Sequence, residues 1–214
     1  MIPKKGSILL VLVLVGAAIS YASDYKIKTV KILPIESYPA RTTISAITIA
    51  ADPYDTDQKT YKAFDVRKLN SKGYFPLHII IKNSSRDFLK IQTRNILLVT
   101  ATGQHLYSTP ASVLVEDVIG TKLSGKIPIL KSDNMSTAGT PGSPLYDFSS
   151  KELTNRIIDP GSVTDGFLFF FTSHPKNNPF AGSSLYIPKL EQEGTGKGIG
   201  PFVIPLDPAL QNKK

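Results

Sequence analysis

The segment that most constrains the fold is YFPLHIIIKN, residues 74–83. Its apolar residues Phe75, Leu77, Ile79 and Ile81 occupy alternate positions, and a period of two is typical of a strand that buries one face. Similar short runs recur at residues 25–33, 43–51, 88–92, 95–103, 166–173, 184–190 and 201–206. Turn-forming residues separate most of them. Many short strands without a βαβ rhythm predict an antiparallel sandwich or barrel.

Three segments carry helix signals. The first is residues 56–64, and the second is residues 109–120, where Thr109 is the expected cap, Pro110 suits the first turn and Gly120 ends the helix. The third is expected to begin at Ser149, because Glu152 has capping-box spacing from it. We expect the first two helices to lie at an end of the sandwich or over one of its faces.

The N-terminus reads as a secretory signal. Lys4 and Lys5 precede an apolar run at residues 8–20, and small residues at Ser20 and Ala22 fit cleavage after Ala22. The alternative is a retained membrane anchor, but the run is shorter than the roughly 20 apolar residues that span a bilayer. We therefore expect residues 1–22 to be a signal peptide and the mature chain to have no stable membrane span.

The mature chain is long enough for one packed domain. We assign residues 23–208 to a single β-sandwich domain, and residues 209–214 to a C-terminal tail. Residues 121–144 are rich in Ser, Thr, Gly and Pro and predict a mobile loop inserted in that domain.

The chain contains no cysteine. Disulfides and a lipid-modified cysteine anchor are therefore excluded, although an exported chain would meet an oxidising compartment. This composition favours a bacterial envelope protein, either periplasmic or extracellular.

The net charge of +8 is unevenly distributed. Residues 23–110 hold 13 Lys and Arg against 7 Asp and Glu, whereas residues 111–214 hold 10 of each. A basic surface attracts lipid head groups, cell-wall polymers or nucleic acid. Because no cluster of Lys and Arg alternates with aromatic residues, we interpret the excess as a solubilising surface and expect no nucleic-acid partner.

Asp52, Asp55 and Asp57 raise the question of a metal site. Closely spaced carboxylates can bind calcium, but the glycine and the closing glutamate of an EF-hand loop are missing. A helix start explains more, because Asp55 can cap, Gln58 has capping-box spacing and Asp57 lies near the positive helix end. We prefer the helix start, expect no cofactor, and keep the three aspartates as candidate calcium ligands.

The signals for catalysis are sparse. His78, His105 and His174 form no short metal-binding spacing, and no G-x-S-x-G elbow occurs. A triad assembled from distant residues stays open as an alternative. The glycine run at residues 193–200 leads into Pro201 and a β-type segment, which predicts a hairpin loop and not a phosphate site.

Three stretches carry a resemblance to a known family. GYFPLHIIIKNSS at residues 73–85 resembles the strand and turn of exported bacterial immunoglobulin-like sandwich domains. IIDPGSVTDGFLFFF at residues 157–171 resembles their later Pro-Gly turn and hydrophobic strand, and the segments SLYIPKL and PFVIPL resemble their closing hairpin. The resemblance implies an immunoglobulin-like fold and no activity.

These observations favour a non-enzymatic, immunoglobulin-like binding or structural module of the cell envelope, with a protein or an envelope polymer as its partner. The alternatives are an envelope hydrolase, a chaperone-like module that pairs with strand edges, and a calcium-dependent binding module. The loops at residues 103–105, 121–144 and 174–179 are the expected binding places. We expect one core that contains Leu77, Ile79, Ile81, Leu98, Phe169 and Ile187, and FLFFF at residues 167–171 as a strand covered on both faces.

Overall fold

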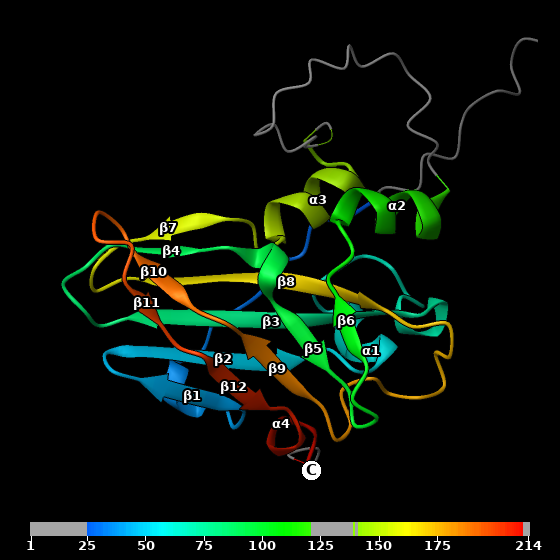
Figure 1. Ribbon diagram of the computed structural model, residues 1–214. Helices are drawn as coiled ribbons and strands as arrows, with labels where there is room; N and C mark the ends of the chain where they lie inside the picture. Colours follow the sequence, from blue (N-terminus) through cyan, green and yellow to red (C-terminus); the bar gives the residue numbers. More distant parts are fainter. Residues whose placement is uncertain (1–24, 121–138, 140, 212–214) are drawn as a thin grey trace, which may run out of the picture.

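The computed structural model describes residues 25–120, 139 and 141–211, and this part of the chain is mainly antiparallel β (Figure 1). The first sheet has the order β1 (Arg41–Ile44), β2 (Ile47–Pro53), β3 (Tyr74–Asn83) and β8 (Val163–Phe171). The second has β11 (Gly198–Ile199), β10 (Leu190–Gln192), β4 (Leu89–Ile91) and β7 (Arg156–Ile158). The third has β12 (Phe202–Pro205), β9 (Ser184–Ile187), β5 (Leu97–Val99) and β6 (His105–Tyr107).

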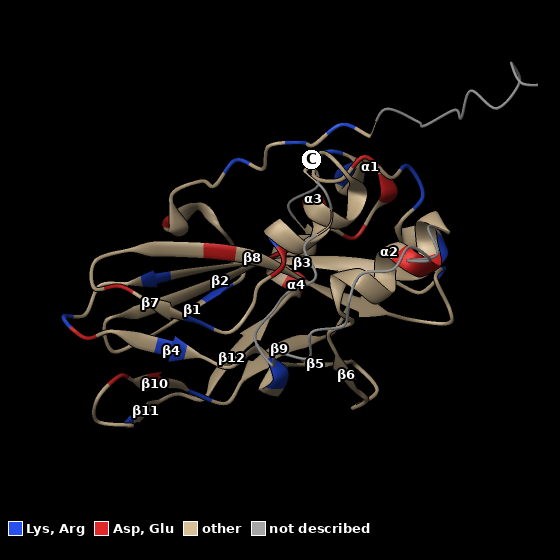
Figure 2. Cartoon of the chain, turned by 90° about the horizontal axis from the view of Figure 1, so that it is seen from above, with Lys and Arg blue, Asp and Glu red and all other residues tan. Residues whose placement is uncertain are grey.

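The sheets form two layers, which is consistent with a β-sandwich. Figure 2 shows the first sheet on one side and the second and third sheets on the other. The main core lies between the layers, where Leu77, Ile79 and Ile81 of β3 meet Leu98 of β5 and Ile187 of β9. These five residues were predicted to share a core, and that prediction is confirmed.

Strand β3 is the centre of the first sheet and pairs with β2 and β8 along nearly its whole length. Its alternating face is buried as predicted, but the opposite face, which includes Tyr74, His78 and Ile80, is buried as well. The prediction of a single buried face is therefore wrong. Other parts of the chain cover the outer face of this sheet, which the local alternation of β3 does not encode.

A second core covers the outer face at one end of the first sheet. It contains residues from α2 (Ala111–Ile119) and α3 (Pro144–Lys151), Ala63 and Phe64, which follow α1 (Asp57–Tyr61), and Phe167 and Phe169 of β8. The Phe64 ring stacks on Phe148 at 4.2 Å between ring centroids and meets Phe167 edge-on at 5.0 Å. The helices thus cover one face, as predicted.

The two faces of β8 belong to different cores. FLFFF at residues 167–171 was predicted to be a strand covered on both faces, and this is confirmed for residues 167–170. Leu168 and Phe170 point into the main core, whereas Phe167 and Phe169 point into the second core. The assignment of Phe169 to the same core as Leu77 is therefore wrong. Strand alternation separates neighbouring side chains by 180°, so an error of one position moves a residue to the other face.

The predicted strand at residues 25–33 is absent, because this segment runs extended over the outer face of the first sheet without joining it (Figure 2). The predicted strand at residues 43–51 is a hairpin of β1 and β2, and Ser45 takes φ 55° in its turn. The short helices η1 (Ile35–Ser37), η2 (Asn70–Lys72) and η3 (Thr93–Asn95) lie in the connections.

The C-terminal tail expected from residue 209 is partly helical. α4 (Asp207–Gln211) places Ala209 and Leu210 against the main core. The expected signal peptide lies outside the described residues, as does most of the expected 121–144 loop, and its last residue, Pro144, begins α3. Within the described ranges, none of the helices is both long and apolar enough to cross a bilayer.

Two of the predicted helix starts are wrong. Pro110, not Thr109, is the N-cap of α2, and the Ala111 N–H donates to Glu152 Oε1 at 3.3 Å. α3 begins well before Ser149, and its cap is Ser143. Gly120 does end α2, with φ 69°.

Candidate binding site

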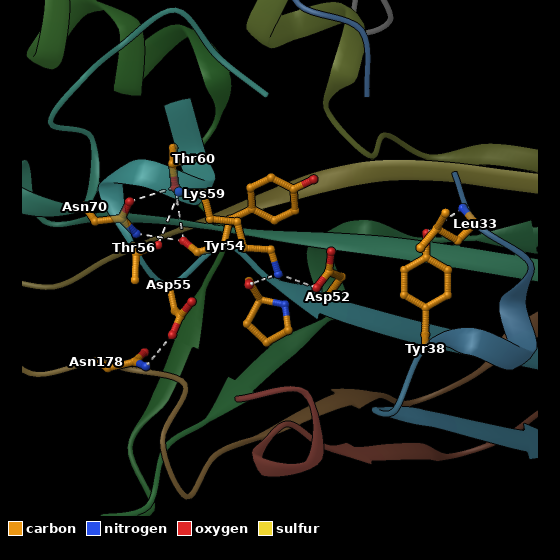
Figure 3. A network of polar contacts seen from close by, with 11 residues as sticks. Leu33, Tyr38, Asp52, Tyr54, Asp55, Thr56, Lys59, Thr60, Asn70 and Asn178 are labelled. Carbon is orange, nitrogen blue, oxygen red and sulfur yellow. Dashed lines mark hydrogen bonds and ion pairs between the residues drawn. The ribbon is translucent and has the colours of Figure 1, made fainter. Parts of the chain in front are cut away.

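The three aspartates do not converge on one point. Figure 3 shows Asp52 directed at Lys59, whose Nζ lies 2.5 Å from Asp52 Oδ1 and also donates to the Pro53 carbonyl at 2.7 Å. Asp55 Oδ2 instead accepts from Asn178 Nδ2 at 3.3 Å. Asp57 Oδ1 accepts the N–H of Asn70 at 2.7 Å.

The helix at this position starts as predicted, but Asp55 is not its cap. Thr56 is the N-cap, and its Oγ1 accepts the Lys59 N–H at 3.2 Å. Asp57 holds the start of η2 through the N–H groups of Asn70 and Ser71. Among the described residues, no group of three or more His, Cys, Asp and Glu side chains could hold a metal ion.

A buried polar network fixes α1 against the end of β2 (Figure 3). Thr60 Oγ1 donates to Asn70 Oδ1 at 2.7 Å, and Asn70 Nδ2 donates to the Tyr54 carbonyl at 2.7 Å. Burial raises the pKa of Tyr54 far above its ordinary value, and the charge of Asp52 adds to this effect. Because its polar groups are matched with one another, we assign this network to stability.

The three histidines lie in three different places. His78 is buried on the outer face of the first sheet, where Nε2 lies 2.7 Å from Asp165 Oδ2 and the ring stacks on Phe167 at 4.5 Å. His105 is exposed on β6, and His174 is exposed in the loop after β8. The structure therefore does not bring these histidines into one site.

Two of the loops that the sequence singled out meet at one pocket. The β5–β6 turn and the 172–179 loop line a volume of about 520 Å³. Gln104 and Leu106 face it from the hairpin, and His174 faces it from the loop, whereas His105 is not among its lining residues. Sequence patterns predicted the two loops, but not that they would meet.

The 172–179 loop is firmly attached to the fold. Phe180, which follows it, is fully buried and packs edge-on against Phe75 and Phe170 of the main core. Asn178 Oδ1 accepts the Phe180 N–H at 3.0 Å, while its Nδ2 reaches Asp55. Asp55 therefore supports the pocket wall from behind, a role that its sequence neighbours did not indicate.

The hairpin turn on the other side is also ordered by its own hydrogen bonds. Thr100 Oγ1 accepts the Gln104 N–H at 3.0 Å, and the Thr100 carbonyl accepts the Gly103 N–H at 2.9 Å. Gly182, with φ 65°, lies so close to Ala101 that an added Cβ would approach the Ala101 Cβ to 2.8 Å. Only glycine fits this contact between the two sides of the pocket.

The described lining of the pocket is uncharged. It consists of hydroxyl and amide side chains, His174, a few aliphatic residues and Phe171, whose side chain is 45% exposed at the rim. Ser173 Oγ lies 3.0 Å from His174 Nδ1, but no carboxylate is among the described lining residues. The group that would orient a catalytic histidine is thus missing from this wall.

A smaller pocket of about 330 Å³ lies beside β6 and contains Glu152, Tyr107 and Arg94. Burial raises the pKa of Glu152, and the hydrogen bond from the Ala111 N–H offsets only part of this effect. Because one carboxylate oxygen of Glu152 already serves the start of α2, we assign this group a structural role.

No protein-family model matches the chain, and no curated protein matches its sequence. Its fold is similar to that of the yjhA protein from Bacillus subtilis, with 8% identity over 70% of this chain and 79% of that one, and a TM-score of 0.38. A functionally unknown protein from Listeria monocytogenes EGD-e is 15% identical over 77% of this chain and 79% of that one, with a TM-score of 0.36. A candidate lipoprotein, ycdA, from Bacillus subtilis is 13% identical over 80% of this chain and 40% of that one, with a TM-score of 0.38. These distant likenesses name no function for this chain.

Proposed function

We propose that the chain is an exported, non-enzymatic, immunoglobulin-like binding module of the cell envelope. The two-layer antiparallel architecture supports the immunoglobulin-like assignment, as does the pairing of β9 with β12. The ligand site is the pocket between the β5–β6 turn and the 172–179 loop. An envelope polymer that carries hydroxyl and amide groups is the ligand class that this wall suits best.

The observation that carries the proposal is the uncharged, hydrogen-bonding lining on two ordered loops. Neutral amide and hydroxyl groups recognise neutral polar groups of a ligand, while an exposed aromatic ring such as Phe171 offers an apolar face. An ordered site loses little conformational entropy when the ligand binds.

The test is co-sedimentation with insoluble cell-wall material stripped of protein. A Gln104→Ala/Asn177→Ala variant removes two exposed amides from the lining, and Asn95→Ala removes an exposed amide elsewhere as the control. Each lost hydrogen bond is worth about 1 kcal/mol, so the double variant should bind roughly 30-fold more weakly. Equal binding by the double variant and the wild type would refute this site.

The hydrolase alternative makes a different prediction for the same material. The Ser173–His174 contact is the observation that favours it. If the wild-type protein released soluble fragments from the wall and His174→Ala abolished the release, the non-enzymatic assignment would be wrong.

A further inference from the structure

The N-terminal segment, residues 25–34, is held against the second core at its beginning. Tyr25 Oη donates to Asp147 Oδ2 at 2.6 Å, and the Lys26 N–H donates to Asp65 Oδ2 at 3.0 Å. Lys28 Nζ lies 3.2 Å from Asp65 Oδ1 and 3.1 Å from the centroid of the Tyr61 ring. These contacts turn Tyr25 and Lys28 inward.

The same segment is also held further along. Val30 packs against the second core, and the Leu33 N–H donates to Tyr38 Oη at 3.0 Å (Figure 3). Ile35 and Tyr38 then pack on Ala50 and Ile80 of the first sheet. The segment is therefore an ordered part of the surface, although it is not a strand of the sheet.

The residues that the segment turns outward form a strip of mixed basic and apolar character. This outward strip consists of Lys26, Ile27, Lys31, Ile32 and Leu33. The three apolar side chains are 49%, 42% and 45% exposed. Within the described residues, neither of the two lysines has an ion-pair partner.

We propose that the outward strip docks on an anionic lipid surface. Lysine ammonium groups attract anionic head groups, and exposed Ile and Leu side chains gain free energy by entering the boundary between head groups and acyl chains. No Asp or Glu lies from Tyr25 to Ile35; of the two acidic residues that flank this range, Asp24 precedes it and Glu36 is paired with Lys82 at 2.9 Å.

The position of the strip in the chain supports a lipid surface over a protein partner. The apolar leader run ends at Ser20, six residues before Lys26. Six residues span at most about 20 Å, so the strip lies at the membrane surface whenever the leader is in the membrane. Once the leader is cleaved, the ordered strip can keep the protein at that surface, because little conformational freedom is lost on docking.

The experiment is flotation of the chain from Ser23 onward with lipid vesicles, which retains every contact of the described fold. Vesicles of phosphatidylcholine with about one third phosphatidylglycerol are compared with pure phosphatidylcholine vesicles. Binding should require the anionic lipid and weaken from low salt to about 0.5 M salt, since charge attraction is screened.

Two strip variants separate the charged from the apolar contribution. Lys26→Gln/Lys31→Gln should bind about 25-fold more weakly, from roughly fivefold for each lysine near the surface. Ile27→Ser/Ile32→Ser/Leu33→Ser should bind roughly tenfold or more weakly while keeping its salt dependence. The matched control is Lys90→Gln/Lys197→Gln, which changes two exposed lysines in the other layer and should weaken binding about twofold at most.

The outcomes decide the proposal. Strip variants that lose binding while they unfold at the wild-type temperature support it. A wild-type chain that ignores anionic vesicles, a control that loses as much as the strip, or an apolar variant that binds normally would each overturn it. If the strip binds a protein instead of lipid, the wild-type chain should not bind anionic vesicles, which is the first of these outcomes.

Discussion

Replacing Tyr25 by Phe tests how firmly the N-terminal segment belongs to the fold. The substitution removes the hydroxyl that donates to Asp147 Oδ2 at 2.6 Å and keeps the ring. Asp147 is fully buried, and its other oxygen, Oδ1, lies 2.6 Å from Lys151 Nζ, which also donates to the Ala63 carbonyl. The Tyr25 hydroxyl is thus the donor for Oδ2, and its removal leaves that buried oxygen without this hydrogen bond.

The expected cost follows from the type of bond. A hydrogen bond to a charged group contributes about 1.5–3 kcal/mol, and Tyr25 is partly exposed, so we expect about 2 kcal/mol. For a domain of this size that loss corresponds to a decrease of roughly 4–8 °C in Tm. The measurement is urea unfolding at pH 7, with Tyr107→Phe as the control for the same chemical change at an exposed site.

The pH dependence provides a second check. Burial and the bond to Asp147 raise the pKa of Tyr25 above its ordinary value of 10.0. A group whose pKa is raised by folding contributes its full stability below the unfolded pKa and loses it as the pH rises further. The difference between the wild type and Tyr25→Phe should therefore shrink above about pH 10.

Trypsin gives the local readout, because Lys26 and Lys31 are exposed. Cleavage after them should be faster in Tyr25→Phe than in the wild type or Tyr107→Phe, since the clamp, the Tyr25–Asp147 hydrogen bond that holds this backbone, is lost. If Tyr25→Phe unfolds within 0.5 kcal/mol of the wild type and is cleaved at the same rate, the inferred clamp does not exist.

Three further predictions concern the helices and the cores. Glu152→Gln keeps the acceptor for the α2 N-terminus but removes a buried charge, so it should be more stable than the wild type at pH 7. Because the pKa of Glu152 is raised, this gain in stability should vanish as the pH falls below about 4.5. A gain that stays constant in thermal melts from pH 3 to 8 would contradict this cause. Asp57→Ala should cost about 1–3 kcal/mol in chemical unfolding with or without calcium, since it leaves two backbone N–H groups without their acceptor; a calcium-dependent rise in the Tm of the wild type alone would restore the metal hypothesis. Phe169→Ala and Phe170→Ala should each cost about 3–5 kcal/mol, because each empties a different buried core; a loss below 1 kcal/mol for either would show that its face is not packed.

Part of the candidate site was within reach of the sequence. The Gly103 turn and the loop after the Phe-rich strand were expected binding places, and turn chemistry is local enough to be read from a few residues. The sequence did not predict that these two loops form one pocket, because that depends on the contact of Gly182 with Ala101 and on the burial of Phe180. Phe171 was not singled out, because it belongs to the apolar run of residues 167–171. It lies at the pocket rim because β8 ends there.

The sequence by itself determined the elements whose pattern is local. The alternation of residues 74–83 defined β3 and its core face, Gly120 defined the end of α2, and the glycine run defined the β10–β11 hairpin. Each of these depends on the preference of a residue for its own backbone conformation or on the strand period, which neighbours along the chain express directly.

Only the tertiary structure decided which surfaces are covered and which polar groups are paired. Residues 25–34 carry a strand-like pattern, yet their partners are helices and a sheet face, so they stay outside the ladder. Glu152 has capping-box spacing from Ser149, yet it serves a helix that begins 41 residues earlier. Burial and hydrogen bonding act across space, and distances along the chain do not report which distant groups folding brings within 3.5 Å.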